Sequence, residues 1–163
     1  MRLAYFQLPQ VVAVIGVLTL LWVGLLPVSA ASLPSVGFYY GDGAAPAAFH
    51  DFDWVVVNPG GDRLPSAFSP QQKVFAYVSI GETTPGDDRY AQLPESCVLG
   101  RNAAWGGKII DLAHAQCRDF LLQKVIDPIW VEGYRGFFLD TLDSYETVTK
   151  GMGRSAQEQG LID

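Results

Sequence analysis

Four short apolar segments, each followed by polar or glycine residues, constrain the fold of this chain more than any other feature. They comprise residues Val36–Tyr40, Trp54–Val57, Val74–Ile80 and Gly136–Asp140. Each segment has the length of a strand, and β-branched or aromatic residues are prominent in it. Residues Trp54–Val57 are continuously apolar, which is typical of a strand buried on both faces. The sequence therefore predicts a sheet of largely buried strands.

Segments with helical patterns lie between and after these strands. Apolar residues recur at spacings of three and four within residues 113–127, and Pro128 is expected either to interrupt that helix or to begin a further turn. A stretch rich in Gly, Pro and Asp, residues 83–107, is expected to form a long loop. Further helices are expected at residues 44–49 and from about residue 143 to residue 159. The chain thus alternates between strands and helices, as α/β proteins do.

This alternation indicates a parallel sheet covered on both faces. Two architectures fit: an open doubly wound sheet, or the first half of a (β/α)8 TIM-like barrel with four parallel strands and intervening helices. The GxGxxG motif that would favour the doubly wound sheet does not follow the first strand. In a barrel, the residues that follow the strands share one mouth, where active sites form. The residues that follow the strands of this chain are polar. Either they line such a mouth, or they are polar simply because the chain leaves the core there. They are Tyr40, Asp42, Asn58, Ser79, Glu82, Asp140 and Asp143.

The first 30 residues have the pattern of an export signal. They carry one charged residue, Arg2, followed by an apolar run from Val11 to Leu26. Pro27 ends this run, and Val28-Ser29-Ala30 places small residues before a cleavage site. A retained membrane anchor is the alternative, although the run is slightly shorter than the roughly 20 residues that span a bilayer. In either case we expect residues 31–163 to be periplasmic or extracellular.

Composition and cysteine content exclude several classes of protein. Hydrophobic residues make up 49% of the chain, which excludes a disordered acidic tail, and a net charge of −6 argues against nucleic acid as a partner. In an oxidising compartment, Cys97 and Cys117 either form a disulfide or remain two separate buried thiols. His50 and His114 are isolated from each other and from both cysteines. We therefore expect no metal site and no cofactor.

Carboxylates near the strand ends carry the chemistry expected of this chain. Asp140 directly follows three apolar strand residues, and Asp143 comes three residues later. Two carboxylates held close together have pKa values that are pushed apart, and glycoside hydrolysis uses such a pair. Alternatively, Asp143 caps the following helix, in a capping box with Glu146. Glu82 is a further candidate, because Gly81 before it permits the close approach of a ligand.

Aromatic residues are dense around these carboxylates. Tyr39, Tyr40, Tyr77, Trp105 and Tyr145 are of the type that packs against the apolar faces of sugar rings. About half of them are expected to belong to the core instead, Tyr77 among them. The combination of carboxylates and aromatic rings favours a carbohydrate as the ligand.

Several of these segments resemble a known family of enzymes. The segments are FYYGD (38–42), DWVVVNPG (53–60), YVSIGE (77–82), GRNAAWGGKIID (100–111) and GYRGFFLDTLDSY (133–145). They are similar to the hydrolase domains of the PelA-like proteins, glycoside hydrolase family 166, which is related to the endo-α-1,4-polygalactosaminidases of family 114. The resemblance implies an exported bacterial (β/α)8 barrel that cleaves a galactosamine-rich, partly cationic exopolysaccharide of the Pel type.

The same resemblance implies roles for particular residues. The family uses an Asp after the fourth strand and a Glu after a later strand. The Asp corresponds by position to Asp140, and Asp143 is a weaker match. We expect the substrate to contact further residues near the strand ends, namely Tyr40, Asp42, Asn58, Glu82, Asn102, Trp105 and Tyr145.

The length of the chain bears on whether it can act alone. A complete barrel needs about 250 residues, whereas about 133 follow residue 30, and the later Glu of the family has no counterpart among them. We therefore expect residues 31–163 to be the first part of a glycosidase barrel and to be inactive alone. A non-catalytic, exported polysaccharide-binding protein is the alternative. Besides the polysaccharide, other exopolysaccharide export proteins are expected partners, and an uncleaved N-terminal segment is the only expected contact with a membrane.

Overall fold

The computed structural model describes residues 32–41, 43 and 46–163. The predicted export segment, Asp42 and the first two residues of the short helix predicted at 44–49 lie outside this part of the chain. Residues Pro34–Asp163 form one compact unit, which is the subject of the following description. None of the helices in the described ranges is long and apolar enough to span a membrane.

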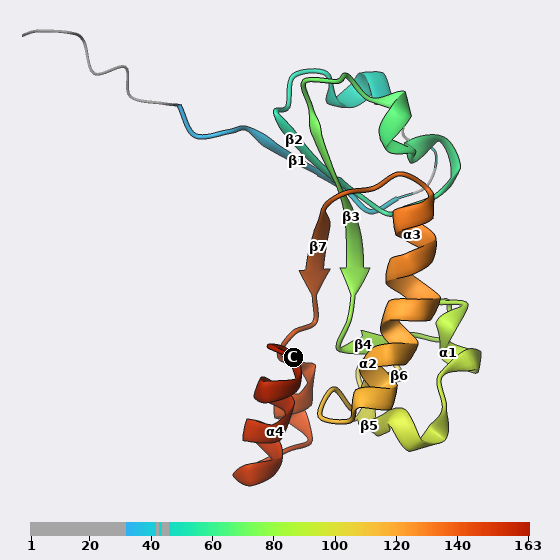
Figure 1. The fold of residues 1–163 in the computed structure, drawn as a ribbon, viewed down its shortest axis with the longest axis vertical. Helices are drawn as coiled ribbons and strands as arrows, with labels where there is room; N and C mark the ends of the chain where they lie inside the picture. Colours follow the sequence, from blue (N-terminus) through green and yellow to red (C-terminus); the bar gives the residue numbers. More distant parts are fainter. Residues whose placement is uncertain (1–31, 42, 44–45) are drawn as a thin grey trace, which may run out of the picture. The chain divides into compact units, whose positions relative to one another are not determined.

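The centre of this unit is a four-stranded parallel sheet (Figure 1). Its strand order is β1-β2-β3-β7, so neighbours in the sheet follow one another along the chain apart from the excursion between β3 and β7. The strands are β1 (Val36–Tyr39), β2 (Trp54–Val57), β3 (Lys73–Ser79) and β7 (Phe137–Asp140). All four predicted strands are therefore present. In the described residues of the first two connections, the helical elements are 3-10 turns: η1 (Pro46–Phe49), η2 (Gly61–Arg63) and η3 (Pro65–Ala67).

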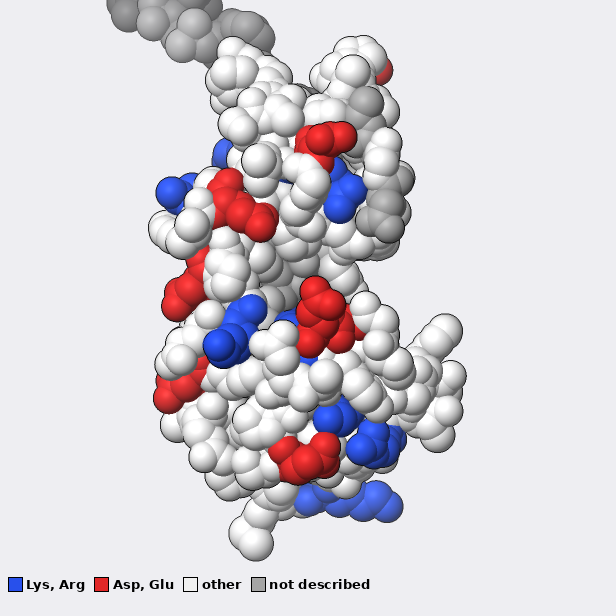
Figure 2. All heavy atoms as spheres, turned by 90° about the vertical axis from the view of Figure 1, so that its right-hand side faces the viewer, with Lys and Arg blue, Asp and Glu red and all other residues white. Residues whose placement is uncertain are grey.

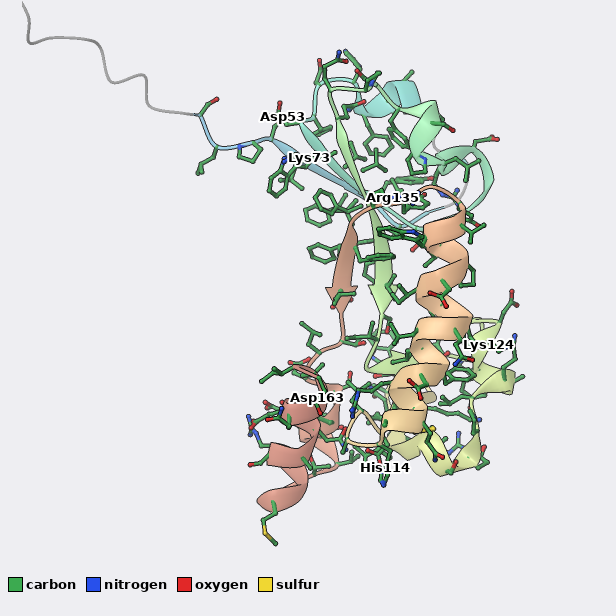
Figure 3. All side chains as sticks on the ribbon, viewed as in Figure 1. Asp53, Lys73, His114, Lys124, Arg135 and Asp163 are labelled. Atoms are coloured by element: carbon green, nitrogen blue, oxygen red, sulfur yellow. A yellow bond between two sulfur atoms is a disulfide. The ribbon has the colours of Figure 1, made fainter. Side chains whose placement is uncertain are left out.

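A long helical segment leads back from the excursion to β7. It consists of α2 (Ala115–Leu121), a π turn, η5 (Leu122–Ile126), and α3 (Asp127–Val131), which follow one another without a gap. His114 precedes its first residue and Arg135 follows its end, and the two side chains lie at opposite ends of the helix (Figure 3). Of the two expectations at Pro128, the structure has the further turn, because α3 begins there with Pro128 in its first turn. In the π turn the Asp127 N–H donates to the Leu122 carbonyl five residues earlier, and the helix continues past Pro128, whose missing N–H falls in the first turn of α3.

The hydrophobic core lies between this helix and one face of the sheet. Because side chains alternate along a strand, Val55, Val57, Ala76 and Val78 point to the same face. They belong to one buried cluster with residues from the helical segment and the turn after it, Cys117, Leu121, Val125, Ile129 and Tyr134. This burial is the main stabilising contribution to the α/β layer.

The opposite face of the sheet carries aromatic rings. Phe38 and Phe138 pack edge to face with centroids 5.3 Å apart, and Tyr77 packs against both Tyr40 and Phe138. Phe38 remains 49% exposed and Phe138 38% exposed. The expectation that both faces are covered is therefore wrong for the described residues, in which helices cover one face only. In a barrel, this second face is the one that points to the interior.

The segment expected to be a long loop contains a second sheet. Strands β4 (Glu82–Thr83), β6 (Gly107–Ile110) and β5 (Val98–Asn102) pair antiparallel in the order β4-β6-β5. Two short helical turns, α1 (Arg89–Gln92) and η4 (Glu95–Cys97), precede β5. The loop prediction is wrong because tertiary packing outweighs the Gly and Pro content around these strands.

A disulfide joins this small sheet to the helix. The sulfur atoms of Cys97 and Cys117 are bonded, with the Cα atoms 5.5 Å apart. Cys97 ends the turn before β5 and Cys117 lies in α2, and both side chains are buried. Of the two alternatives that the sequence leaves open, the structure has the disulfide.

The C-terminal segment contains two short helices. They are η6 (Ser144–Thr147) and α4 (Met152–Gly160), where a single helix from Asp143 to Gln159 was expected. Asp143 occupies the N-cap position of η6, but its side chain makes no capping hydrogen bond. Glu146 pairs instead with Arg154 of α4, so the predicted capping box does not form.

Candidate active site

A cavity of about 1240 Å³ lies where the carboxyl end of the parallel sheet meets the small antiparallel sheet. Its walls come from the ends of β3 and β7, the residues after β2, and the strands β4 and β5 with the turns that follow them. One side of the helical segment, at Lys124, Val125, Pro128 and Ile129, also lines it. Six of the residues predicted to be catalytic or to contact the substrate line it: Asn58, Glu82, Asn102, Trp105, Asp140 and Asp143. The parallel sheet therefore brings residues that are distant in the sequence to one place.

Asp140 is the last residue of β7 and is held by its neighbour β3. The register pairs it with Ser79, and its carbonyl accepts a hydrogen bond of 3.1 Å from the Ile80 N–H. Its carboxylate atom Oδ2 accepts a hydrogen bond of 2.5 Å from the hydroxyl of Tyr77. Both the backbone and the side chain of Asp140 thus have defined partners.

Tyr77 contributes to the cavity, although its sequence context suggested a core residue. Residues 75, 77 and 79 of β3 point to one face, and the Tyr77 hydroxyl reaches diagonally across the β3–β7 pair to Asp140. Burial raises the pKa of Tyr77 well above its usual range, and the hydrogen bond to Asp140 acts in the same direction. Tyr77 therefore stays protonated, as a hydrogen-bond donor, across the neutral range. The signal for this role is its position two residues before the polar end of a strand.

Tyr40 packs on Tyr77 at the end of β1. Their ring centroids are 4.6 Å apart, and the Tyr40 carbonyl accepts a hydrogen bond from the side-chain amide of Asn58. Burial, followed by the negative charge of Asp140, raises the pKa of Tyr40. Tyr40 is half-exposed and lies beside the cavity lining, of which Tyr77 and Asn58 are part.

Thr141 fixes the backbone directly after Asp140. It has a φ of 61°, in the left-handed region that side-chain-bearing residues seldom adopt. Its hydroxyl interacts with the Ser79 hydroxyl at 2.8 Å and accepts a hydrogen bond of 3.0 Å from the Gly81 N–H. A Cβ atom at Gly81 would overlap the Thr141 carbonyl oxygen. Ser79 and Gly81 stand out in the sequence, but Thr141, which ties the ends of β3 and β7 together and approaches Gly81 closely, does not.

Glu82 is a buried carboxylate on the opposite wall. Only 6% of the residue is exposed, and its carboxylate accepts hydrogen bonds from Asn102 at 3.1 Å and Ser144 at 3.3 Å. Gly107 of β6 has no side chain, and a Cβ there would overlap the Glu82 carboxylate. The small antiparallel sheet therefore supplies both the partner and the space for this acid. Partnering is required here, because an unpaired buried carboxylate is costly.

The remaining predicted site residues have different environments. Trp105, after β5, is 72% exposed and lines the cavity, so its ring is free to contact a ligand. Asp143 is exposed and also lines the cavity. Tyr145 is only 6% exposed and is not among the lining residues. Asp42 lies outside the described residues.

The lining also contains charged residues that do not stand out in the sequence, namely Arg63, Asp87, Asp88, Arg89 and Lys124. Asp87 and Arg89 form an ion pair, and Arg89 also donates to the Ser79 carbonyl at 2.9 Å. Burial alone would raise the pKa of Asp87, but the hydrogen bonds and positive charge of Arg89 outweigh it and lower that pKa. Figure 2 shows acidic and basic side chains interspersed over one face of the molecule. Within the described ranges, no group of three or more His, Cys, Asp or Glu side chains could hold a metal ion.

This arrangement defines a class of protein. A β/α sheet of barrel type that presents carboxylates and aromatic rings at the carboxyl ends of its strands is the arrangement of barrel glycoside hydrolases. The model of glycoside hydrolase family GH114 matches residues 39–162, and the chain belongs to this family. The family resemblance inferred from the sequence is thereby confirmed, with the match falling on the related family 114.

Solved structures give the same result for the fold. The chain is 30% identical to the glycoside hydrolase domain of PelA from Pseudomonas aeruginosa, with a TM-score of 0.57, over 79% of this chain and 53% of that domain. A variant of the PelA domain, in which a glutamate is replaced by alanine, matches equally well. Ega3 from Aspergillus fumigatus, in complex with galactosamine, is 17% identical, with a TM-score of 0.56 over 78% of this chain and 51% of that one.

The chain matches only part of each of these domains. The chain spans about half the length of each of these solved domains. It therefore corresponds to part of a TIM-type barrel, as the sequence predicted. A search of the curated proteins finds no match.

Proposed function

We propose that this chain carries one wall of a glycoside hydrolase site, in which Asp140 is one of the two catalytic carboxylates. The observation that carries the proposal is the Asp140 carboxylate at the end of β7, held by Tyr77 in a cavity with aromatic walls. Membership in family GH114 supports the same reaction class. The reaction is hydrolysis of a glycosidic bond by acid and base catalysis.

The substrate that we propose is a galactosamine-containing polysaccharide. The residues that would contact it are the lining carboxylates Glu82 and Asp143, the amide of Asn102 and the exposed ring of Trp105. Carboxylates accept hydrogen bonds from hydroxyl and ammonium groups, and an aromatic ring packs on the apolar face of a sugar. The similarity to PelA and to a protein solved with galactosamine supports this choice.

Two further features belong to this proposal. We propose that residues 1–30 direct export and that residues 31–163 form the carbohydrate-acting part, at the periplasmic or extracellular side. The buried disulfide between Cys97 and Cys117 supports export, because disulfides persist in oxidising compartments.

Asp143, which is three residues from Asp140, is a less suitable catalytic carboxylate than Asp140. Its side chain is exposed, and no capping hydrogen bond holds it.

A site that binds the polysaccharide without cleaving it is the second candidate. The observation that favours it is the exposed ring of Trp105 in the cavity lining, a type of group that packs on a sugar without taking part in bond cleavage. In hydrolysis the two carboxylates stand about 5–10 Å apart across the bond, so both must be present. Binding needs only the wall that the chain supplies.

Two assays on residues 31–163 test whether the chain binds the polysaccharide and whether it cleaves the polymer alone. The first measures binding of an α-1,4-linked galactosamine oligosaccharide by calorimetry, and the second measures new reducing ends when the polymer is incubated with the protein. We expect binding without release of reducing ends from this chain alone. Absence of binding would refute the carbohydrate site, and release of reducing ends would show that the chain holds both carboxylates.

A further inference from the structure

The hydroxyl of Tyr77 meets the carboxylate of Asp140 across the β3–β7 pair. We propose that Tyr77 is a positioning residue: it fixes the rotamer of Asp140 by holding Oδ2, so that Oδ1 is the oxygen presented to the substrate. The inference rests on the proposed function, in which Asp140 acts on the substrate. It assigns to Tyr77 a role distinct from packing.

The Asp140 backbone is already fixed without Tyr77. Its carbonyl accepts hydrogen bonds from the Ile80 N–H at 3.1 Å and from the Thr141 hydroxyl at 2.7 Å. The register with β3 fixes the height of Asp140 in the sheet. Rotation about the side-chain bonds is therefore the freedom that remains, and the hydrogen bond of 2.5 Å from Tyr77 removes it.

Tyr77 itself is well suited to hold another group. Its ring packs against Tyr40 at 4.6 Å and Phe138 at 6.5 Å between centroids, and its neighbours in β3, Ala76 and Val78, are buried. A tyrosine has only two side-chain torsions, so packing of the ring fixes the hydroxyl at small entropic cost. A donor fixed in this way orients a carboxylate before the substrate arrives, which is how enzyme sites are preorganised.

The test compares the full chain with Tyr77→Phe and with the control Tyr134→Phe. The control also removes a buried tyrosine hydroxyl, which donates at 2.6 Å to the Arg63 carbonyl, but it does not contact Asp140. Three-bond couplings to the Asp140 carboxyl carbon, measured by NMR, report its side-chain rotamer. We expect a single rotamer in the wild type and in Tyr134→Phe, and averaged couplings in Tyr77→Phe. A single rotamer in Tyr77→Phe would overturn the proposal.

Carbohydrate affinity gives the functional readout. Loss of one oriented hydrogen bond should raise the dissociation constant for a galactosamine tetrasaccharide about fivefold in Tyr77→Phe, without a comparable change in Tyr134→Phe. If the wild type does not bind the sugar, the proposed function fails, while the couplings still decide whether Tyr77 positions Asp140.

A second variant covers the case in which Tyr77→Phe does not fold. Asp140→Ala removes the acceptor of the Tyr77 hydrogen bond and the nearby negative charge, both of which raise the pKa of Tyr77. We expect the Tyr77 hydroxyl proton to exchange with solvent faster in Asp140→Ala than in the wild type, as measured by NMR, because its acceptor is gone. An unchanged exchange rate would contradict the contact on which the proposal depends.

Discussion

Reduction of the disulfide should destabilise the folded chain by a predictable amount. Cys97 and Cys117 are 20 positions apart, and their bond closes a loop that contains β5 and β6. In the chain-entropy model, a loop of this size stabilises the folded state by about 3 kcal/mol. Both side chains are buried, so the bond also lies within the packed core.

Urea unfolding of residues 31–163 measures this stabilisation without a change of sequence. With a slope of roughly 1.5 kcal/mol per molar urea, a loss of about 3 kcal/mol lowers the midpoint by about 2 M when a reductant is added. The control is the double variant Cys97→Ala/Cys117→Ala, whose midpoint should be low and should not respond to the reductant. Equal midpoints for the oxidised and reduced wild type would refute the reasoning.

The same perturbation should affect the cavity. Asn102, the partner of Glu82, lies in the closed loop, and so does the exposed Trp105. A looser loop orders these groups less well before binding, so we expect the reduced protein to bind the galactosamine oligosaccharide more weakly than the oxidised one.

Three further substitutions test the packing and the charges around the site. Gly81→Ala should destabilise the chain by about 2 kcal/mol in urea unfolding, because the new Cβ meets the Thr141 carbonyl. Asp87→Asn should make the free energy of unfolding depend less on pH below about pH 4. In the folded wild type, the hydrogen bonds and charge of Arg89 lower the pKa of Asp87. The interaction of the two residues therefore stabilises the fold fully above about pH 4, and this stabilisation is lost as the pH falls further. Tyr134→Phe should cost about 1 kcal/mol, because it removes a buried hydrogen bond to a backbone carbonyl; no change in the midpoint would contradict that bond.

The parallel sheet could be predicted from the sequence for a simple physical reason. Strands such as Trp54–Val57 are buried, and burial requires uninterrupted apolar residues that stand out from the rest of the chain. The end of each strand then places Asn58 and Asp140 at one edge, which follows from parallel geometry alone. The lining of the cavity by both residues agrees with that prediction.

The antiparallel sheet and the finer contacts of the site could not be predicted in this way. Strand β5, Val98–Asn102, contains Gly, Arg and Asn, and its pairing depends on packing rather than on propensity. The hydrogen bond between Tyr77 and Asp140 depends on the register between β3 and β7, which the sequence leaves open. The absence of the capping box has a similar origin, because the Glu146 side chain pairs with Arg154 from a separate helix and the Glu146 N–H donates to the Asp143 carbonyl.

The affinity of Asp140→Asn for a galactosamine oligosaccharide tests the central claim most directly. This substitution keeps the shape of the side chain and removes its charge. Asp119→Asn is the matched control, because Asp119 is exposed in α2 and is not part of the cavity lining. We predict that Asp140→Asn weakens binding by residues 31–163 about tenfold or more, the cost of losing one charged hydrogen bond, and that Asp119→Asn binds as the wild type does. Equal affinities for Asp140→Asn and the wild type would contradict a carbohydrate site centred on Asp140.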